Sequence, residues 1–83
     1  MPDHFYIPVR YRNEENEYLV TLVLLSYSYQ LHVEVDNQSL VFEPDDNGEF
    51  RMIKMGWQNE SDLKLIDAQL IQRLIETLNK IYN

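Results

Sequence analysis

The C-terminal stretch 66–82 constrains the fold most, because it carries the only strong helical pattern in the chain. On a helical wheel at about 100° per residue, its large apolar side chains share one arc of about 140°. These side chains are Leu70, Ile71, Leu74, Ile75, Leu78, Ile81 and Tyr82. A helix of about 15 residues is only marginally stable alone in water. The rest of the chain must therefore offer an apolar surface that buries this arc.

The same wheel indicates where the helix begins. Extended backwards, it would place Asp67 on the apolar side and Leu65 and Ile66 on the polar side. We therefore predict a helix over 68–82, with Asp67 as the N-cap whose carboxylate accepts from backbone N–H groups of the first turn. Ile66 and Ile71 then occupy the two positions of a hydrophobic staple. A helix starting at Ser61 is the less favoured alternative, because Leu65 and Ile66 would face water.

Everything before the helix alternates between apolar and polar residues in short runs separated by turn residues. This pattern predicts five strands, over 4–12, 17–27, 29–36, 39–43 and 49–55. Short connections favour antiparallel pairing of consecutive strands. The predicted fold class is α+β, an antiparallel meander sheet of about five strands with one C-terminal helix packed on one face, in a single domain 1–83. Residues 57–65 are expected to connect sheet and helix, with a short extended piece at Leu63 and Leu65.

The segment 17–27 is unusual because both of its faces are largely apolar. One face would hold Tyr18, Val20, Leu22 and Leu24, and the other Leu19, Thr21, Val23 and Leu25. Such a strand is normally covered on both sides. One helix covers one side, so we expect a curled sheet, a long loop or a second protein chain on the other. Pro8 lacks a backbone N–H, which predicts a sheet edge or a bulge for the first strand.

Composition and charge narrow the functional classes. The chain has 83 residues and no cysteine, which excludes disulfides, thiolate metal sites and a cysteine nucleophile. It has no signal-peptide pattern and no apolar run of membrane-spanning length, so we expect a soluble cytoplasmic protein. Net charge is −7 without a cluster of Lys and Arg along the chain, which disfavours binding to nucleic acid and to anionic membranes. The acidic balance chiefly confers solubility; affinity for a basic partner and mimicry of nucleic acid are the alternatives.

Two stretches resemble parts of metal sites. Residues 43–48 match the first half of an EF-hand calcium loop, but the twelfth position is Lys54 and the flanks read as strands, so a hairpin turn is favoured. His32 and Glu34 lie two apart on one strand and would point to the same face. A third ligand is missing, since the other histidine, His4, lies near the N-terminus. We therefore expect no metal ion and no cofactor.

No sequence pattern indicates catalysis. The serines lie outside any Gly-x-Ser-x-Gly elbow, and the two glycines, Gly48 and Gly56, are too few for a phosphate-binding loop. We therefore do not expect an enzyme.

The aromatic residues give the best indication of a binding surface. The chain has six tyrosines, and tyrosine suits interfaces because it combines apolar area with a polar group. The candidate interaction surface consists of Tyr6, Tyr18, Tyr27 and Trp57, with Tyr29 as a further member. Cross-strand packing explains the tyrosines equally well. Trp57 follows Met52, Met55 and Gly56, and we favour its folding over the open end of the core above a role as an interface anchor.

These observations lead to one functional expectation and two alternatives. We expect a small non-enzymatic protein-interaction or accessory module that binds a protein partner or forms a homodimer, through the uncovered sheet face or a strand edge. The first alternative is an acidic inhibitor or nucleic-acid mimic that binds a basic partner. The second is a small-ligand-binding domain.

Overall fold

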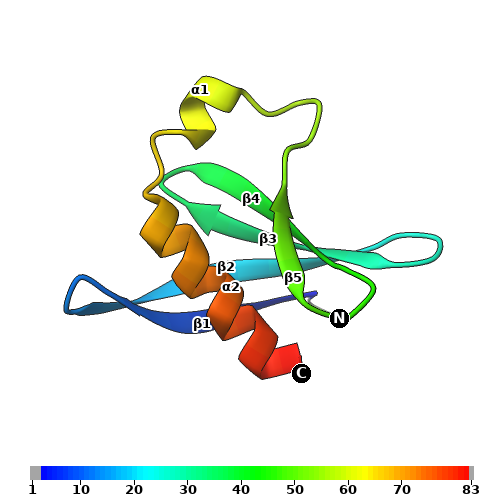
Figure 1. The fold of residues 1–83 in the computed structure, drawn as a ribbon, viewed down its shortest axis with the longest axis horizontal. Coiled ribbons are helices and arrows are strands. Elements are labelled where there is room, and N and C mark those ends of the chain that lie inside the picture. The colour runs from blue at the N-terminus through cyan, green and yellow to red at the C-terminus, as the bar shows by residue number, and fades with distance from the viewer. Residues whose placement is uncertain (1–2, 83) are drawn as a thin grey trace.

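A computed structural model describes residues 3–82 as one antiparallel sheet and two helices (Figure 1). The elements are β1 (His4–Tyr11), β2 (Glu14–Leu24), β3 (Tyr29–Val35), β4 (Gln38–Pro44), β5 (Phe50–Ile53), α1 (Glu60–Leu63) and α2 (Ala68–Tyr82). The strands follow the order β1-β2-β3-β4-β5, and every neighbouring pair is antiparallel. The predicted fold class, a meander sheet with a C-terminal helix, is confirmed.

The core lies between the sheet and α2. From α2, Leu70, Leu74 and Leu78 are buried, as expected from the helical wheel. Helix α2 contacts both β1 and β5, the first and last strands, so the sheet curls around it (Figure 1). The end of the helix departs from the predicted buried face, because Ile81 is 51% exposed.

Two strand boundaries differ from the prediction because the first turn is tighter than expected. The turn consists of Arg12 and Asn13 alone, which both have positive φ, at 54° and 63°. Tyr11 and Glu14 face each other across it, so β1 ends at Tyr11 and β2 begins at Glu14. A two-residue turn with both residues in the left-handed region matches the twist of the flanking strands. The β3–β4 turn repeats this geometry at Asp36 and Asn37.

The position of Pro8 follows from the hydrogen-bond pattern of β1 and β2. Asp3 faces Leu22 in the register, and its carbonyl accepts from the Leu22 N–H at 2.6 Å. Because such pairs alternate along an antiparallel ladder, Phe5, Ile7, Val9 and Tyr11 also bond to β2. The backbone groups of His4, Tyr6, Pro8 and Arg10 therefore point away from β2. Pro8 lies at a sheet edge, at a position where its missing N–H costs no ladder bond.

The segment 57–65 contains a short helix, α1, where the sequence predicted an extended piece. Asn59 caps this helix, because its side-chain oxygen accepts from the Ser61 N–H at 2.8 Å. Leu63 enters the core, whereas Leu65 is 80% exposed. The two leucines therefore do not alternate along a strand as predicted. A single helical turn is too short to show a helical period in the sequence.

Side chains cover the sheet edge formed by β5 and β4. Strand β5 is shorter than predicted, so the first half of β4 is paired with β3 but has no strand on its outer side. There, the Gln58 side chain donates to the Ser39 carbonyl at 2.6 Å. On β5, the Phe50 N–H donates to the Asn79 side chain of α2 at 2.9 Å. This edge is therefore capped at two points.

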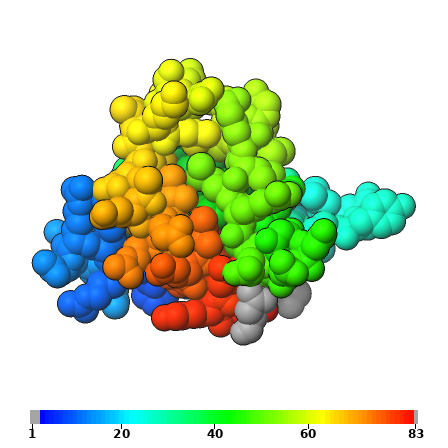
Figure 2. Space-filling model, in the orientation of Figure 1, coloured from blue at the N-terminus to red at the C-terminus, as the bar shows by residue number. Residues whose placement is uncertain are grey.

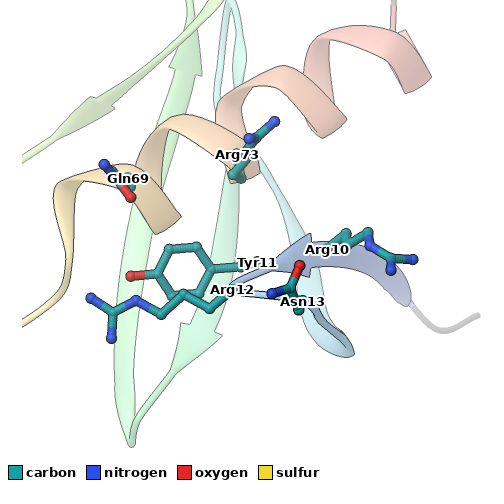
Figure 3. Close-up of a pocket in the computed structure, with 6 residues that line it drawn as sticks. All are labelled: Arg10, Tyr11, Arg12, Asn13, Gln69 and Arg73. Carbon is teal, nitrogen blue, oxygen red and sulfur yellow. The ribbon is translucent and has the colours of Figure 1, made fainter.

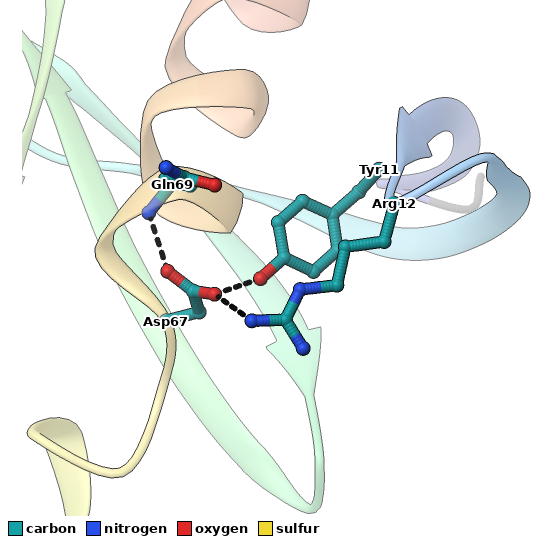
Figure 4. Close-up of polar contacts among 4 residues, drawn as sticks. All are labelled: Tyr11, Arg12, Asp67 and Gln69. Carbon is teal, nitrogen blue, oxygen red and sulfur yellow. Dashed lines mark hydrogen bonds and ion pairs between the residues drawn. The ribbon is translucent and has the colours of Figure 1, made fainter.

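Asp67 ties the start of α2 to the first hairpin (Figure 4). Its Oδ1 accepts from the Gln69 N–H at 2.8 Å, which places Asp67 at the predicted N-cap. Its Oδ2 accepts from the Tyr11 hydroxyl and from Arg12 Nη2, the latter at 2.9 Å. One carboxylate thus fixes the helix start against the β1–β2 turn.

Candidate interaction surface

The sheet face opposite α2, here called the far face, has an uncharged centre and a charged rim. Because directly opposed residues share a face, the register assigns its members. The centre consists of Tyr6, Leu19, Thr21, Val23, Gln30, His32, Ser39, Val41 and Ile53. Both signs of charge border it, from Arg10, Glu15, Glu17, Glu34, Glu43 and Arg51. Depletion of charge at the centre with a polar rim is typical of protein interfaces.

Side chains cover the half of the far face that belongs to β3, β4 and β5. Val41 lies there between His32 and Ile53 in the register, yet it is fully buried. The Trp57 ring lies 6.5 Å from the His32 ring. Trp57 therefore sits against the far face, not over the open end of the core as we favoured from the sequence, and it remains 62% exposed.

A polar network holds the buried Gln30 in this covered half. The Gln30 Nε2 donates to Glu43 Oε2 at 2.8 Å, and Gln30 Oε1 lies 3.1 Å from His32 Nε2. Because an amide oxygen only accepts, this arrangement requires the His32 tautomer that carries a proton on Nε2. Burial lowers the pKa of His32 below 6.5, and the nearby Glu34 opposes this shift. His32 therefore serves as a neutral donor in a structural network.

The half of the far face formed by β1 and β2 is open. Tyr6 is 61% exposed, and Leu19 and Val23 are half-buried. In the described part of the chain, neither helix covers these side chains, since α2 packs on the opposite face and α1 places Leu63 in that same core. The apolar second face of β2, which the sequence indicated, is thus left without a covering element.

The β2–β3 hairpin extends this open surface beyond the body of the molecule (Figure 2). Its tip carries Leu24, which is 72% exposed, the half-exposed Leu25 and the fully exposed Tyr27. Residues 18–33 contain no Asp, Glu, Lys or Arg, although these types make up 25% of the chain. This is the longest uncharged stretch in the sequence, and it includes the hairpin tip and part of the far face.

The four residues of the predicted interaction surface do not lie together. Tyr6 lies on β1 and Trp57 lies against His32 of β3, both on the far face, and Tyr27 lies at the hairpin tip. Tyr18 faces the opposite side, where it pairs with the core residue Ile7. Burial, with smaller contributions from Asp36 and Glu14, raises the pKa of the Tyr18 hydroxyl above 10.0. Tyr18 therefore belongs to the margin of the core.

Tyr29, the further candidate, also lies on the helix side. Its ring lies 6.1 Å from the Phe50 ring and 6.0 Å from the Tyr82 ring. This three-ring cluster closes the end of the core beside the last turn of α2. Packing in the core, the alternative explanation for the tyrosines, thus accounts for Tyr29.

The two stretches that resemble metal sites have structural roles. Asp45 Oδ1 accepts from the N–H groups of Asn47 and Glu49, at 2.8 and 3.0 Å, and so closes the β4–β5 turn. The Glu34 carboxylate accepts from the Ser39 hydroxyl. Across residues 3–82, no group of three or more His, Asp or Glu side chains is placed to hold a metal ion.

A cluster of cations beside α2 corresponds to no local pattern in the sequence. A hollow of about 310 Å³ is lined by Arg10, Tyr11, Arg12, Asn13, Gln69 and Arg73 (Figure 3). Its arginines come from positions about 60 residues apart in the sequence, so no local pattern reveals them. Only the pairing of a hairpin turn with the start of α2 brings them together.

Comparisons with known proteins provide no relative. No protein-family model, no curated protein and no solved structure matches the chain significantly. Neither helix in the described range is long and apolar enough to span a membrane.

Proposed function

We propose that the chain is a non-enzymatic protein-interaction module that self-associates through the far face and the hairpin tip. The observation that carries this proposal is the uncharged centre of the far face, left open over β1 and β2. Two half-buried side chains there, Leu19 and Val23, would gain burial against a second copy. The mixed signs of the rim would set the orientation of the two copies.

The area of the far face indicates that the interface also needs the hairpin tip. A stable interface buries about 800 Å² per partner, roughly one seventh of the 5876 Å² that the chain exposes. Five strands about 4.8 Å apart, each about 20 Å long, give a face of roughly 500 Å². The sheet face alone is therefore small for a stable dimer, and the projecting hairpin would supply the remaining area.

The distribution of carboxylates does not favour the nucleic-acid mimic. Glu14, Glu15 and Glu17 follow the β1–β2 turn, whereas Glu43 to Glu49 surround the β4–β5 turn at the other end of the strands. Phosphate mimicry requires regularly spaced charges on one face. The acidic surface thus supports solubility better than mimicry.

Light scattering coupled to size exclusion, across a concentration series, tests the proposal. We expect the mass to rise from the 10.0 kDa of one chain towards twice that value. A single-chain mass at every concentration would overturn self-association.

Two variants and one control locate the surface. Leu19→Lys and Leu25→Lys each place a charge in the proposed interface and should raise the dimer dissociation constant at least tenfold. Leu65→Lys makes the same change at an exposed leucine outside the surface and should leave the dimer dissociation constant unchanged. Equal effects in all three variants would place the interface elsewhere.

A further inference from the structure

Two adjoining hollows between the edge strand β1 and helix α2 are together called the groove here. The hollow of Figure 3 is followed by a second one of about 280 Å³, and the two share Arg10 and Arg73. Pro8 and Val9 form the strand wall of the second hollow, and Thr77 belongs to its helix wall.

The helix wall is a single stripe of α2. Gln69, Arg73, Glu76 and Lys80 are spaced at i, i+4, i+7 and i+11, which places them on one side of the helix. This stripe lies beside the one that buries Leu70, Leu74 and Leu78, so α2 packs on the sheet with one side and borders the groove with the next.

The groove concentrates positive charge in an acidic chain. Its lining includes four of the seven Lys and Arg residues, Arg10, Arg12, Arg73 and Lys80, but only two of the fourteen acidic residues, Glu15 and Glu76. The local charge is therefore +2 in a chain of −7. Arg12 forms an ion pair with Asp67, and Arg73 Nη1 lies 3.6 Å from Glu76 Oε1.

The strand wall is an open sheet edge. Tyr6 and Arg10 direct their backbone N–H groups away from β2, and within residues 3–82 no side chain bonds to these groups. The opposite edge differs, since Gln58 and Asn79 cap it. An edge strand with unpaired groups is a template for an additional strand.

We propose that this groove binds an extended, acidic segment of another protein as a sixth strand alongside β1. Backbone bonds to Tyr6, Arg10 and the Pro8 carbonyl would hold the segment, and alternate carboxylates would face Arg73 and Lys80. Pro8 has no backbone N–H, so the edge offers one hydrogen-bond donor fewer. Specificity for the bound segment therefore depends more on charge. The same positive charge opposes pairing of two β1 edges, because each would bring Arg10 to the other.

The geometry favours an extended peptide above a single bound anion. Arg10 and Arg12 extend in opposite directions from the turn (Figure 3), so they do not converge on one phosphate or carboxylate. A peptide that runs along the groove meets its cations in succession instead.

Fluorescence anisotropy with three defined probes tests this proposal. The first probe is a labelled octapeptide of alternating Thr and Glu, which is extended, soluble and acidic. The second replaces Glu with Lys, and the third methylates the backbone nitrogen of every other residue of the first. We expect the acidic peptide alone to bind. Equal binding of the lysine peptide would overturn the role of charge, and equal binding of the methylated peptide would overturn strand addition.

Three variants sharpen the test. Arg73→Glu should weaken binding of the acidic peptide at least tenfold, whereas Lys54→Glu, the same change of charge directly after β5, should leave it within twofold. Pro8→Val adds an outward N–H at the edge, and one further hydrogen bond should strengthen binding about fivefold. Unchanged binding in Arg73→Glu would overturn the site. Amide resonances of Tyr6 and Arg10 that do not shift on peptide addition would overturn strand pairing independently of any variant.

This proposal stands apart from self-association. Leu19→Lys, which should weaken the dimer at least tenfold, leaves the groove intact and should retain peptide binding. A protein that stays monomeric yet binds the acidic peptide would therefore contradict only the proposed function. One that dimerises without binding any probe would contradict only the groove.

Discussion

Asp67 shows how one residue determines where a helix begins and what it begins against. Its two carboxylate oxygens serve different partners, the helix backbone on one side and the Tyr11 hydroxyl with Arg12 on the other. Arg12 is largely exposed, so its ion pair contributes little, about 0–1 kcal/mol. The cap and the tyrosine hydroxyl should dominate the contribution of Asp67 to stability.

Substituting Asp67 should separate these contributions. Asp67→Ala removes the cap and both outer contacts, and should lower the free energy of unfolding by about 2 kcal/mol. Asp67→Asn keeps a capping oxygen and should lower it by about 1 kcal/mol. Urea unfolding measures both. Asp46 is an exposed carboxylate without a side-chain partner in the described structure, so Asp46→Ala should change the free energy of unfolding by less than about 0.5 kcal/mol. A smaller loss in Asp67→Ala than in this control would contradict the role of Asp67.

His32 gives the fold a dependence on pH. Because burial lowers its pKa below 6.5, the unfolded chain takes up a proton at a higher pH than the folded chain. The stability that neutral His32 contributes is complete above pH 6.5 and is lost as the pH falls below it. The free energy of unfolding should therefore be lower at pH 5.5 than at pH 7.5, as measured by urea unfolding at the two values. His32→Gln should reduce this difference, and His4→Gln, which keeps His32, should retain it.

At the scale of single elements, regular periodicity separated what the sequence could predict from what it could not. Helix α2 spans four turns, so its apolar arc and the Asp67 cap could be located from the sequence. Helix α1 has four residues and shows no period. The acidic residues after Asn13 read as a loop, yet Glu15 pairs with Arg10 across the ladder and belongs to β2. Tertiary pairing, which a single sequence does not display, decided that boundary.

The candidate surfaces divide in the same way. The apolar second face of β2 was visible as an alternation within one strand, and the structure leaves it without a covering element. The cationic groove was not visible, because Arg10 and Arg73 meet only after the helix packs beside β1. A site assembled from distant segments needs the fold before it can be recognised.

The shared geometry of the two tight turns predicts how substitutions in them change stability. Asn37 has a φ of 66° at the second position of a two-residue turn, where glycine is free of steric cost. Asn37→Gly should raise the free energy of unfolding by about 0.5 kcal/mol, and Asn37→Ala should lower it by about 1 kcal/mol. Thermal unfolding of the two variants against the parent chain measures the difference. Asn13, at φ 63°, offers a matched pair of variants in the first hairpin, and opposite signs in the two hairpins would contradict the shared turn geometry.

At the scale of the whole molecule, the two proposed surfaces have opposite electrostatic character. Two copies that each carry −7 repel one another on association, whereas the groove attracts an acidic segment at short range. Added salt screens both interactions, since the screening length falls to about 3 Å at about 1 M. The two equilibria should therefore respond to salt in opposite directions.

This contrast is measurable on one preparation. Raising NaCl from about 0.05 M to about 0.5 M should tighten the dimer in sedimentation equilibrium and weaken the acidic peptide in anisotropy, each by severalfold. Loss of both interactions at high salt would mean that the far face associates through its charged rim and not through its uncharged centre. Peptide binding that is insensitive to salt would remove the role of Arg73 and Lys80.

The unequal edges of the sheet also determine what kind of assembly the chain is able to build. A filament of stacked sheets needs two open edges on every subunit, one to receive a strand and one to offer it. Gln58 and Asn79 cap the edge formed by β4 and β5 at two points, whereas within residues 3–82 no side chain caps the outward N–H groups of Tyr6 and Arg10 on β1. A sheet that extends across β1 therefore meets a partly capped edge on the other side of this subunit. The chain is better suited to ending a stack of strands than to propagating one.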